Sequence, residues 1–113
     1  CPIACALDHL GDKWTLLIIR DLLLGKRRYH EFMASPERIA TNILADRLKK
    51  LEAAGFVLQQ AYQQKPVRYD YQLTQKGEDL RPVLEALVAW GKVYYPGTRV
   101  FSSHQQQSIS AEQ

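Results

Sequence analysis

Apolar residues near the start of the chain recur at helical spacing and predict two helices. The first covers residues 2–10, where Pro2 suits the first helical position because its missing N–H would be unpaired there anyway. The second runs from Lys13 to about Leu24, and Asp12 directly before it is a suitable N-cap. Apolar residues occupy nearly every face of this second helix, which is typical of a helix buried at the centre of a domain.

The next stretch has the pattern of a helix-turn-helix. A short helix is expected over Tyr29–Ala34, and Ser35–Pro36 ends it. A longer helix is expected over about residues 40–54, with Thr41 or Asn42 able to cap its start. The apolar stripe of this longer helix consists of Ile43, Leu44, Leu48 and Leu51. Two helices joined by a tight, non-helical turn form a candidate helix-turn-helix.

After Gly55 the pattern changes to that of β-structure. Phe56–Tyr62 and Val67–Leu73 are strand-like runs, and the second alternates between apolar and polar positions. The segment Gln63–Pro66 between them is polar and contains a proline. It therefore predicts the tip of a β-hairpin.

The last apolar stretch predicts a long final helix that begins after Thr74, a good N-cap. Pro82 lies about two turns inside it, so either the helix is kinked or its regular part begins near Arg81. Taken together, the elements predict a winged helix-turn-helix domain, mainly α with a small β-hairpin, with N- and C-terminal helices used for dimerisation. This domain is expected over residues 1–101, followed by a polar, flexible tail over residues 102–113.

Positive charge is concentrated in the middle of the chain. The 113 residues carry a net charge of +3, but residues 26–68 alone hold nine basic and four acidic side chains. Such a segment suits the binding of a polyanion, and the alternative is an ordinary solvated face. The longest apolar runs are far shorter than the roughly 20 residues that span a bilayer. No signal sequence opens the chain, so we expect a soluble, cytoplasmic protein.

The polar face of the helix over residues 40–54 is the candidate surface for reading DNA bases. Asn42 in its first turn could pair with adenine in the major groove, and the alternative is that Asn42 and Thr41 only cap the helix. The candidate base-reading residues are Thr41, Asn42, Ala45, Asp46, Lys49 and Lys50; the candidate contacts to the DNA backbone are Arg27, Arg28, Lys65 and Arg68. Arg47 is a further backbone candidate, although it could instead pair with Asp46 or Glu52 or anchor the wing.

Six segments of the sequence carry a resemblance to a known family in their order and spacing. These segments are Cys1–Pro2, Gly11–Ile18, Gly25–Tyr29, Ile39–Leu48, Tyr69–Gly77 and Leu84–Gly91. Together they resemble the HxlR-type transcriptional regulators, winged-helix proteins related to the MarR type, over about residues 1–95. The resemblance implies a homodimer, assembled through the first and last helices, that binds a pseudo-palindromic operator and represses or activates nearby genes. It also implies that the start of the recognition helix, Ala40–Asn42, points at the bases and that Tyr62–Arg68 forms the wing.

Two cysteines, Cys1 and Cys5, lie together at one end, which does not suggest a disulfide framework. In some HxlR-type proteins the cysteine before the proline, here Cys1, is a redox or electrophile sensor, and the start of a helix favours the thiolate. The alternative is that both are small core or interface residues. Cys1, Cys5 and His9 recur every four residues, but residues eight apart on a helix are about 12 Å apart, so we expect no metal site.

Nothing in the sequence indicates catalysis. His9, His30 and His104 stand in no nucleophile motif, and no glycine-rich phosphate loop occurs. We therefore expect no enzyme activity and no cofactor. The expected partners are double-stranded DNA and a second copy of the chain, with a small-molecule effector as a further candidate. The competing interpretation is a winged helix that binds proteins rather than DNA, and the basic residues Lys49, Lys50, Lys65 and Arg68 argue against it.

Overall fold

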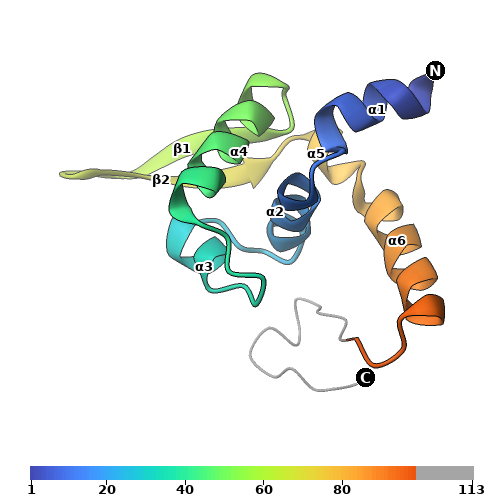
Figure 1. The fold of residues 1–113 in the computed structure, drawn as a ribbon. Helices are drawn as coiled ribbons and strands as arrows, with labels where there is room; N and C mark the ends of the chain where they lie inside the picture. Colours follow the sequence, from blue (N-terminus) through green and yellow to red (C-terminus); the bar gives the residue numbers. More distant parts are fainter. Residues whose placement is uncertain (99–113) are drawn as a thin grey trace.

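The structure, a computed structural model, describes residues 1–98 (Figure 1). Its elements in chain order are α1 (Pro2–Leu10), α2 (Lys13–Leu23), α3 (Tyr29–Met33), α4 (Thr41–Ala53), β1 (Val57–Gln64), β2 (Val67–Leu73), α5 (Gln75–Glu78) and α6 (Arg81–Tyr94). The predicted fold class, a winged helix-turn-helix domain that is mainly α with a small hairpin, is confirmed. The predicted tail over residues 102–113, and the predicted end of the domain at residue 101, lie outside the described residues.

The helix α2 forms the centre of the domain, as its apolar faces predict. The Asp12 carboxylate caps its start and accepts hydrogen bonds from the backbone N–H groups of Trp14 and Thr15, both at 3.1 Å. Side chains from both helices of the helix-turn-helix and from the hairpin root pack around α2. The buried core consists of Leu10, Ile18, Ile19, Leu22, Phe32, Ile39, Leu44, Leu48, Leu51, Phe56, Val57, Tyr71 and Leu80. One core therefore fixes α4 relative to the hairpin.

The hairpin is longer than its sequence predicts. Its two strands are antiparallel, with Val57 opposite Leu73 at the root and Gln64 opposite Val67 at the tip. The residues Gln63 and Gln64, expected in the tip, still pair with β2, because strand pairing uses backbone groups and tolerates polar side chains at an exposed end. The hairpin consequently projects well beyond the core (Figure 1).

Two helix starts differ from the predictions. Ala40 is the N-cap of α4 and makes no side-chain cap bond, so the prediction that Thr41 or Asn42 caps this helix is wrong. Packing of the leucine stripe on the core supplies the stability that a cap would otherwise provide. Thr74 caps the short α5 instead of the long final helix. The helix α6 begins at Arg81, the second of the two alternatives that Pro82 left open.

The helices α1 and α6 extend from the side of the domain opposite the hairpin (Figure 1). No residue of α6 is buried in the single chain, and Trp90 is 57% exposed. The large hydrophobic side chains left exposed on the two helices are Ile3, Leu7, Val83, Leu87, Val88, Trp90, Val93 and Tyr94. The single chain thus leaves a broad apolar surface uncovered on this side.

Candidate nucleic-acid interface

The helix α4 presents a polar face on the side away from the core. Leu44, Leu48 and Leu51 are buried on its inner side, as predicted. The predicted base-reading residues are all exposed, and they are Ala40, Thr41, Asn42, Ala45, Asp46, Lys49 and Lys50. A helix of 13 residues, about 20 Å long, has the size and the free face that entry into a major groove requires.

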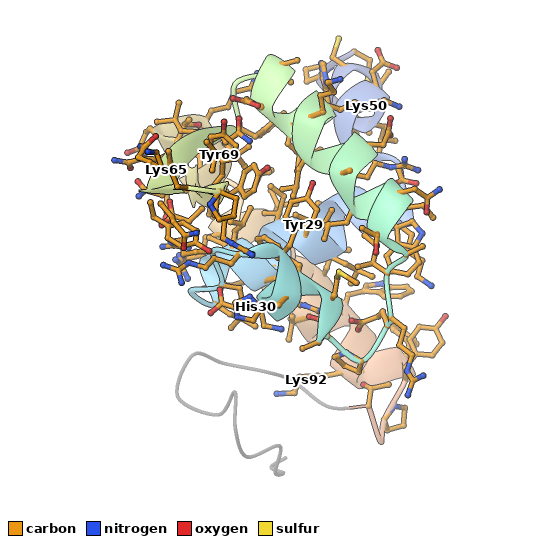
Figure 2. The ribbon with its side chains drawn as sticks, turned by 90° about the vertical axis from the view of Figure 1, so that its left-hand side faces the viewer. Tyr29, His30, Lys50, Lys65, Tyr69 and Lys92 are labelled. Carbon is orange, nitrogen blue, oxygen red and sulfur yellow. The ribbon has the colours of Figure 1, made fainter. Side chains whose placement is uncertain are left out.

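The wing places two further cations beside this helix. Lys65 at the hairpin tip and Arg68 at the start of β2 are exposed, and neither side chain has an acidic partner among residues 1–98. Figure 2 views the molecule from the wing end, and both the hairpin with Lys65 and the helix with Lys50 face the viewer. Exposed cations therefore lie both on α4 and on the hairpin, and Lys50 on α4 forms an ion pair with Asp46 at 3.3 Å.

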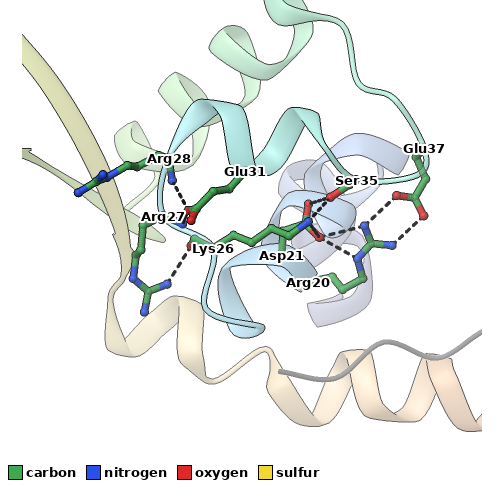
Figure 3. A network of polar contacts seen from close by, with 8 residues as sticks. All are labelled: Arg20, Asp21, Lys26, Arg27, Arg28, Glu31, Ser35 and Glu37. Carbon is green, nitrogen blue, oxygen red and sulfur yellow. Dashed lines mark hydrogen bonds and ion pairs between the residues drawn. The ribbon is translucent and has the colours of Figure 1, made fainter. Parts of the chain in front are cut away.

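A network of polar contacts holds the turn between α3 and α4 (Figure 3). The Arg20 guanidinium donates to both carboxylate oxygens of Glu37 at 2.8 Å and to Asp21 Oδ1 at 2.9 and 3.1 Å. The Ser35 hydroxyl donates to Asp21 Oδ2 at 2.6 Å and accepts a bond of 2.6 Å from Lys26 Nζ. Asp21 is buried, and a buried carboxylate is tolerated because it is paired and hydrogen-bonded in this way. The network ties the turn to the central helix.

The same turn contains a strained residue that sequence reasoning missed. Arg38 has a φ of +58°, a left-handed conformation that residues other than glycine seldom adopt. Its neighbours are fixed on both sides, since Glu37 is bonded to Arg20 and Ile39 is buried in the core. Arg38 is itself exposed, directly before α4. The only sequence signal was its membership of the basic segment.

Arg47 does not face outward as a backbone contact. Its guanidinium binds the Asp12 carboxylate at 2.8 and 3.1 Å and Asp46 at 2.7 Å. The alternative of pairing with Asp46 is therefore realised, and the contact with Asp12 was not foreseen because the two residues are 35 positions apart. The hydrogen bond from Arg47 lowers the pKa of Asp12 to about 2. These hydrogen bonds favour the alternative in which Arg47 pairs within the chain over a contact with the DNA backbone.

The neighbouring arginines Arg27 and Arg28 differ in their surroundings. The Arg27 guanidinium donates to the carbonyl oxygens of Leu22 at 3.1 Å and Lys26 at 3.0 Å, so it closes the end of α2. The Arg28 guanidinium lies 3.6 Å from the ring centroid of Tyr62 on β1, a cation–π contact. Arg27 therefore stabilises the end of α2, whereas Arg28 lies between α3 and the hairpin.

Both cysteines lie on the surface of α1. Cys1 is the N-cap of this helix, and Cys1 and Cys5 are exposed free thiols, so neither belongs to the core of the single chain, and the alternative of interface residues stays open. An open cleft of about 460 Å³ separates α1 from α4 and includes Leu7, His9 and Lys50 in its walls. In the part of the chain that the structure describes, no group of three histidine, cysteine or acidic residues could hold a metal ion.

Comparison with protein families matches residues 9–99 to the HxlR-like helix-turn-helix family. The chain belongs to this family. An uncharacterized HTH-type transcriptional regulator of Methanothermobacter thermautotrophicus is 34% identical to this HxlR-like protein over 108 residues, which cover 96% of this chain and 77% of the relative. The resemblance to the HxlR-type winged helix-turn-helix regulators is thus confirmed. The family is one of transcriptional regulators and is not an enzyme class.

Solved structures of regulators share the fold of this HxlR-like protein. The redox regulator HypR in its oxidized form aligns with a TM-score of 0.74 at 33% identity, over 82% of this chain and 96% of HypR. The reduced form of YodB from B. subtilis aligns with a TM-score of 0.70 at 34% identity, over 87% of this chain and 97% of YodB. Among residues 1–98, no helix is long and apolar enough to cross a membrane.

Proposed function

We propose that this protein binds double-stranded DNA in a sequence-specific manner, in the cytoplasm, as a homodimer on a pseudo-palindromic operator. The observation that carries the proposal is the shared exposure of the α4 polar face and the wing cations Lys65 and Arg68. In this arrangement α4 enters the major groove and Asn42 in its first turn reads a base edge. The wing and Arg28 contact the sugar–phosphate backbone.

The test is fluorescence anisotropy of the reduced protein on a random-sequence duplex over a salt series. DNA binding releases condensed counterions, so we expect the logarithm of the affinity to fall steeply with the logarithm of the salt concentration. Absence of binding at low salt would refute the proposal. It would favour the second candidate function, a winged helix that binds proteins.

The uncovered faces of α1 and α6 support the homodimer. Ile3 is 70% exposed and Trp90 is exposed in the C-terminal half of α6, an arrangement that costs free energy in a lone chain. A second copy of the chain would cover both helices. Sedimentation equilibrium should give twice the 13.0 kDa chain mass, and Trp90→Glu should give the single chain, whereas the control Lys49→Gln should leave the dimer intact.

The dimer fixes the geometry of the operator. Two recognition helices related by a two-fold axis reach successive major grooves on one side of the duplex, about 34–36 Å apart or a multiple of that distance. A footprint on a selected operator should therefore show two inverted half-sites. A single isolated half-site would contradict the dimer.

Cys1 is our candidate for a redox-responsive residue. It is an exposed thiol at the start of α1, and HypR, a structural neighbour of this chain, is a redox regulator. Oxidation at this position would act on the dimerising helix and so on the spacing of the two recognition helices. Peroxide should change the DNA affinity of the protein and of Cys5→Ser but not of Cys1→Ser; equal responses of both variants would leave Cys1 an interface residue only.

A further inference from the structure

Arg38 has an unusual backbone conformation for an arginine. Among residues 1–98 it is the only residue other than glycine with a positive φ, at +58°. The left-handed region suits glycine, and a residue with a Cβ has a higher free energy there. Residues in such conformations persist only where the surrounding structure imposes them, and they are concentrated at functional sites. An arginine at this position therefore points to a role for its side chain.

The turn between α3 and α4 holds Arg38 from both sides. Glu37 before it is fixed by the Arg20 guanidinium, which donates to both carboxylate oxygens at 2.8 Å (Figure 3). Ile39 after it is buried in the core, and the Arg38 N–H donates to the Ser35 carbonyl oxygen at 3.0 Å. Because both neighbours are anchored to α2 and the core, the Arg38 side chain is left in solvent.

The Arg38 guanidinium is unpaired. Among residues 1–98 it has no hydrogen bond, ion pair or ring contact. Both oxygens of the adjacent Glu37 carboxylate are bonded to Arg20 instead. The Arg27 and Arg28 side chains, by contrast, are engaged by carbonyl oxygens and by a tyrosine ring. Within the described chain, Arg38 is thus a cation that is available to an anion.

The first half of α4 carries no positive charge of its own. Residues 39–46 include no lysine or arginine, and the first basic residue of the helix, Arg47, is bonded to two carboxylates within the chain. The first turn of α4 is nevertheless the part that we place in the major groove. Arg38 lies two residues before the N-cap Ala40 and is the cation nearest in sequence to this turn.

We propose that Arg38 is a contact to the DNA backbone, an inference that rests on the proposed function. With the first turn of α4 in the major groove, the segment directly before the helix passes the phosphates that border the groove. The guanidinium fork of Arg38 would bind one of these phosphates through two parallel hydrogen bonds. Such a contact carries no sequence information, but it fixes how α4 is seated in the groove.

The proposal gives the strain at Arg38 a function. Glycine would fit the left-handed backbone better but has no guanidinium to offer a phosphate. Stability and DNA affinity are therefore opposed at this position, a trade-off that is common at functional sites. Glu37 acts here as a positioning residue, because its bonds to Arg20 hold the turn that presents the Arg38 side chain.

The test combines thermal unfolding with fluorescence anisotropy on a random-sequence duplex over a salt series. Arg38→Gly and Arg38→Ala should each weaken DNA binding about threefold or more and reduce the salt slope by about one. Only Arg38→Gly should raise the melting temperature, so affinity follows the side chain and stability follows the backbone. Arg38→Lys should keep the slope, and the control Lys92→Ala should change neither affinity nor slope. Wild-type affinity and slope in Arg38→Ala would overturn the contact.

A double-mutant cycle tests the positioning role of Glu37. Once Glu37→Ala has released the turn, the affinity loss caused by Arg38→Ala should fall to less than about twofold, and the slope should no longer change. Glu37→Gln, which keeps the shape of the side chain, is the second variant should Glu37→Ala fail to fold. An equal loss in both backgrounds would overturn the role of Glu37.

A wing variant in the same titrations separates this proposal from the proposed function. Absence of DNA binding by the wild-type protein would refute the proposed function and the Arg38 contact together. DNA binding in which Lys65→Ala reduces the salt slope and Arg38→Ala does not would overturn the Arg38 contact alone. A reduced slope in both variants would support both.

Discussion

The Arg47 guanidinium of α4 forms two hydrogen bonds to the Asp12 carboxylate, from Nε to Oδ2 at 2.8 Å and from Nη2 to Oδ1 at 3.1 Å. The same carboxylate caps α2 through the backbone N–H groups of Trp14 and Thr15. Asp12 therefore joins α4 to the short connection between α1 and α2. Through this pair, the position of α4 is linked to the helix that we propose as part of the dimer interface.

Loss of the Asp12 side chain should destabilise the fold more than loss of its charge. Asp12→Ala removes the cap and the ion pair, and we expect the free energy of unfolding to fall by about 1–2 kcal/mol. Asp12→Asn keeps an acceptor for the cap, and Arg47→Ala removes only a partly exposed pair, so each should cost about 1 kcal/mol or less. Urea denaturation with Asp8→Asn as the control measures these differences. Equal losses for Asp12→Asn and Asp12→Ala would contradict the cap.

The stability conferred by Arg47 should disappear in acid. The pKa of Asp12 is lowered from 3.8 to about 2, so this group stabilises the folded state above about pH 4 and loses that contribution as the pH falls through 2. The pKa of Asp46 is lowered by the same guanidinium and changes stability in the same direction. The difference in unfolding free energy between wild type and Arg47→Ala should be constant from pH 7 to pH 4 and shrink below it. A difference that persists unchanged at pH 2 would count against the pair.

Relief of the strain at Arg38 should stabilise the domain. A left-handed conformation costs a residue with a Cβ about 1–2 kcal/mol, which exceeds the entropic cost of glycine of about 0.5–1 kcal/mol. We therefore expect Arg38→Gly to raise the free energy of unfolding by up to about 1 kcal/mol. Arg38→Ala removes the same charge but keeps the strain, so it is the matched control. Thermal or urea unfolding in which the two variants are equally stable would show that the turn is unstrained.

The wing cations should contribute to DNA affinity without regard to sequence. Lys65→Ala and Arg68→Ala should each weaken binding to all duplexes and reduce the salt slope by about one. Lys92→Ala removes a cation from α6, on the other side of the molecule, and should change neither quantity. Anisotropy titrations over a salt series provide the measurement. An unchanged slope in both wing variants would remove the wing from the contact surface.

Asn42 should determine base preference rather than overall affinity. Because Ala40 is the N-cap of α4, Asn42→Ala removes no cap bond and should leave stability unchanged. At the base pair it reads, we expect a loss of about 1–3 kcal/mol of discrimination with little change in nonspecific binding. Selection of bound sequences from a random library compares the two preference profiles. Identical profiles would exclude Asn42 as a base contact.

The helices and strands of this protein could be predicted from its sequence because apolar residues recur at different intervals in a helix and in a strand. Apolar residues at helical intervals indicated α2 and α4, and alternation from Val67 to Leu73 indicated β2. The inward leucines of α4 also fixed which residues of that helix are exposed. The position of Pro82, by contrast, allowed two helix starts, since a single residue cannot show how the chain packs around it.

Contacts between distant segments were decided only by the tertiary structure. Arg47 and Arg27 carry the same charge as Arg68, but the fold turns the first onto Asp12 and the second onto the end of α2, and leaves the third in solvent. The cleft of about 370 Å³ between α3 and the hairpin likewise exists only because these segments lie side by side. Periodicity reports which side of an element is apolar, whereas the partner of a charge depends on segments that packing brings together across many residues. The sequence by itself therefore determined the elements and the basic character of the protein, and the packing decided which cations are free to bind.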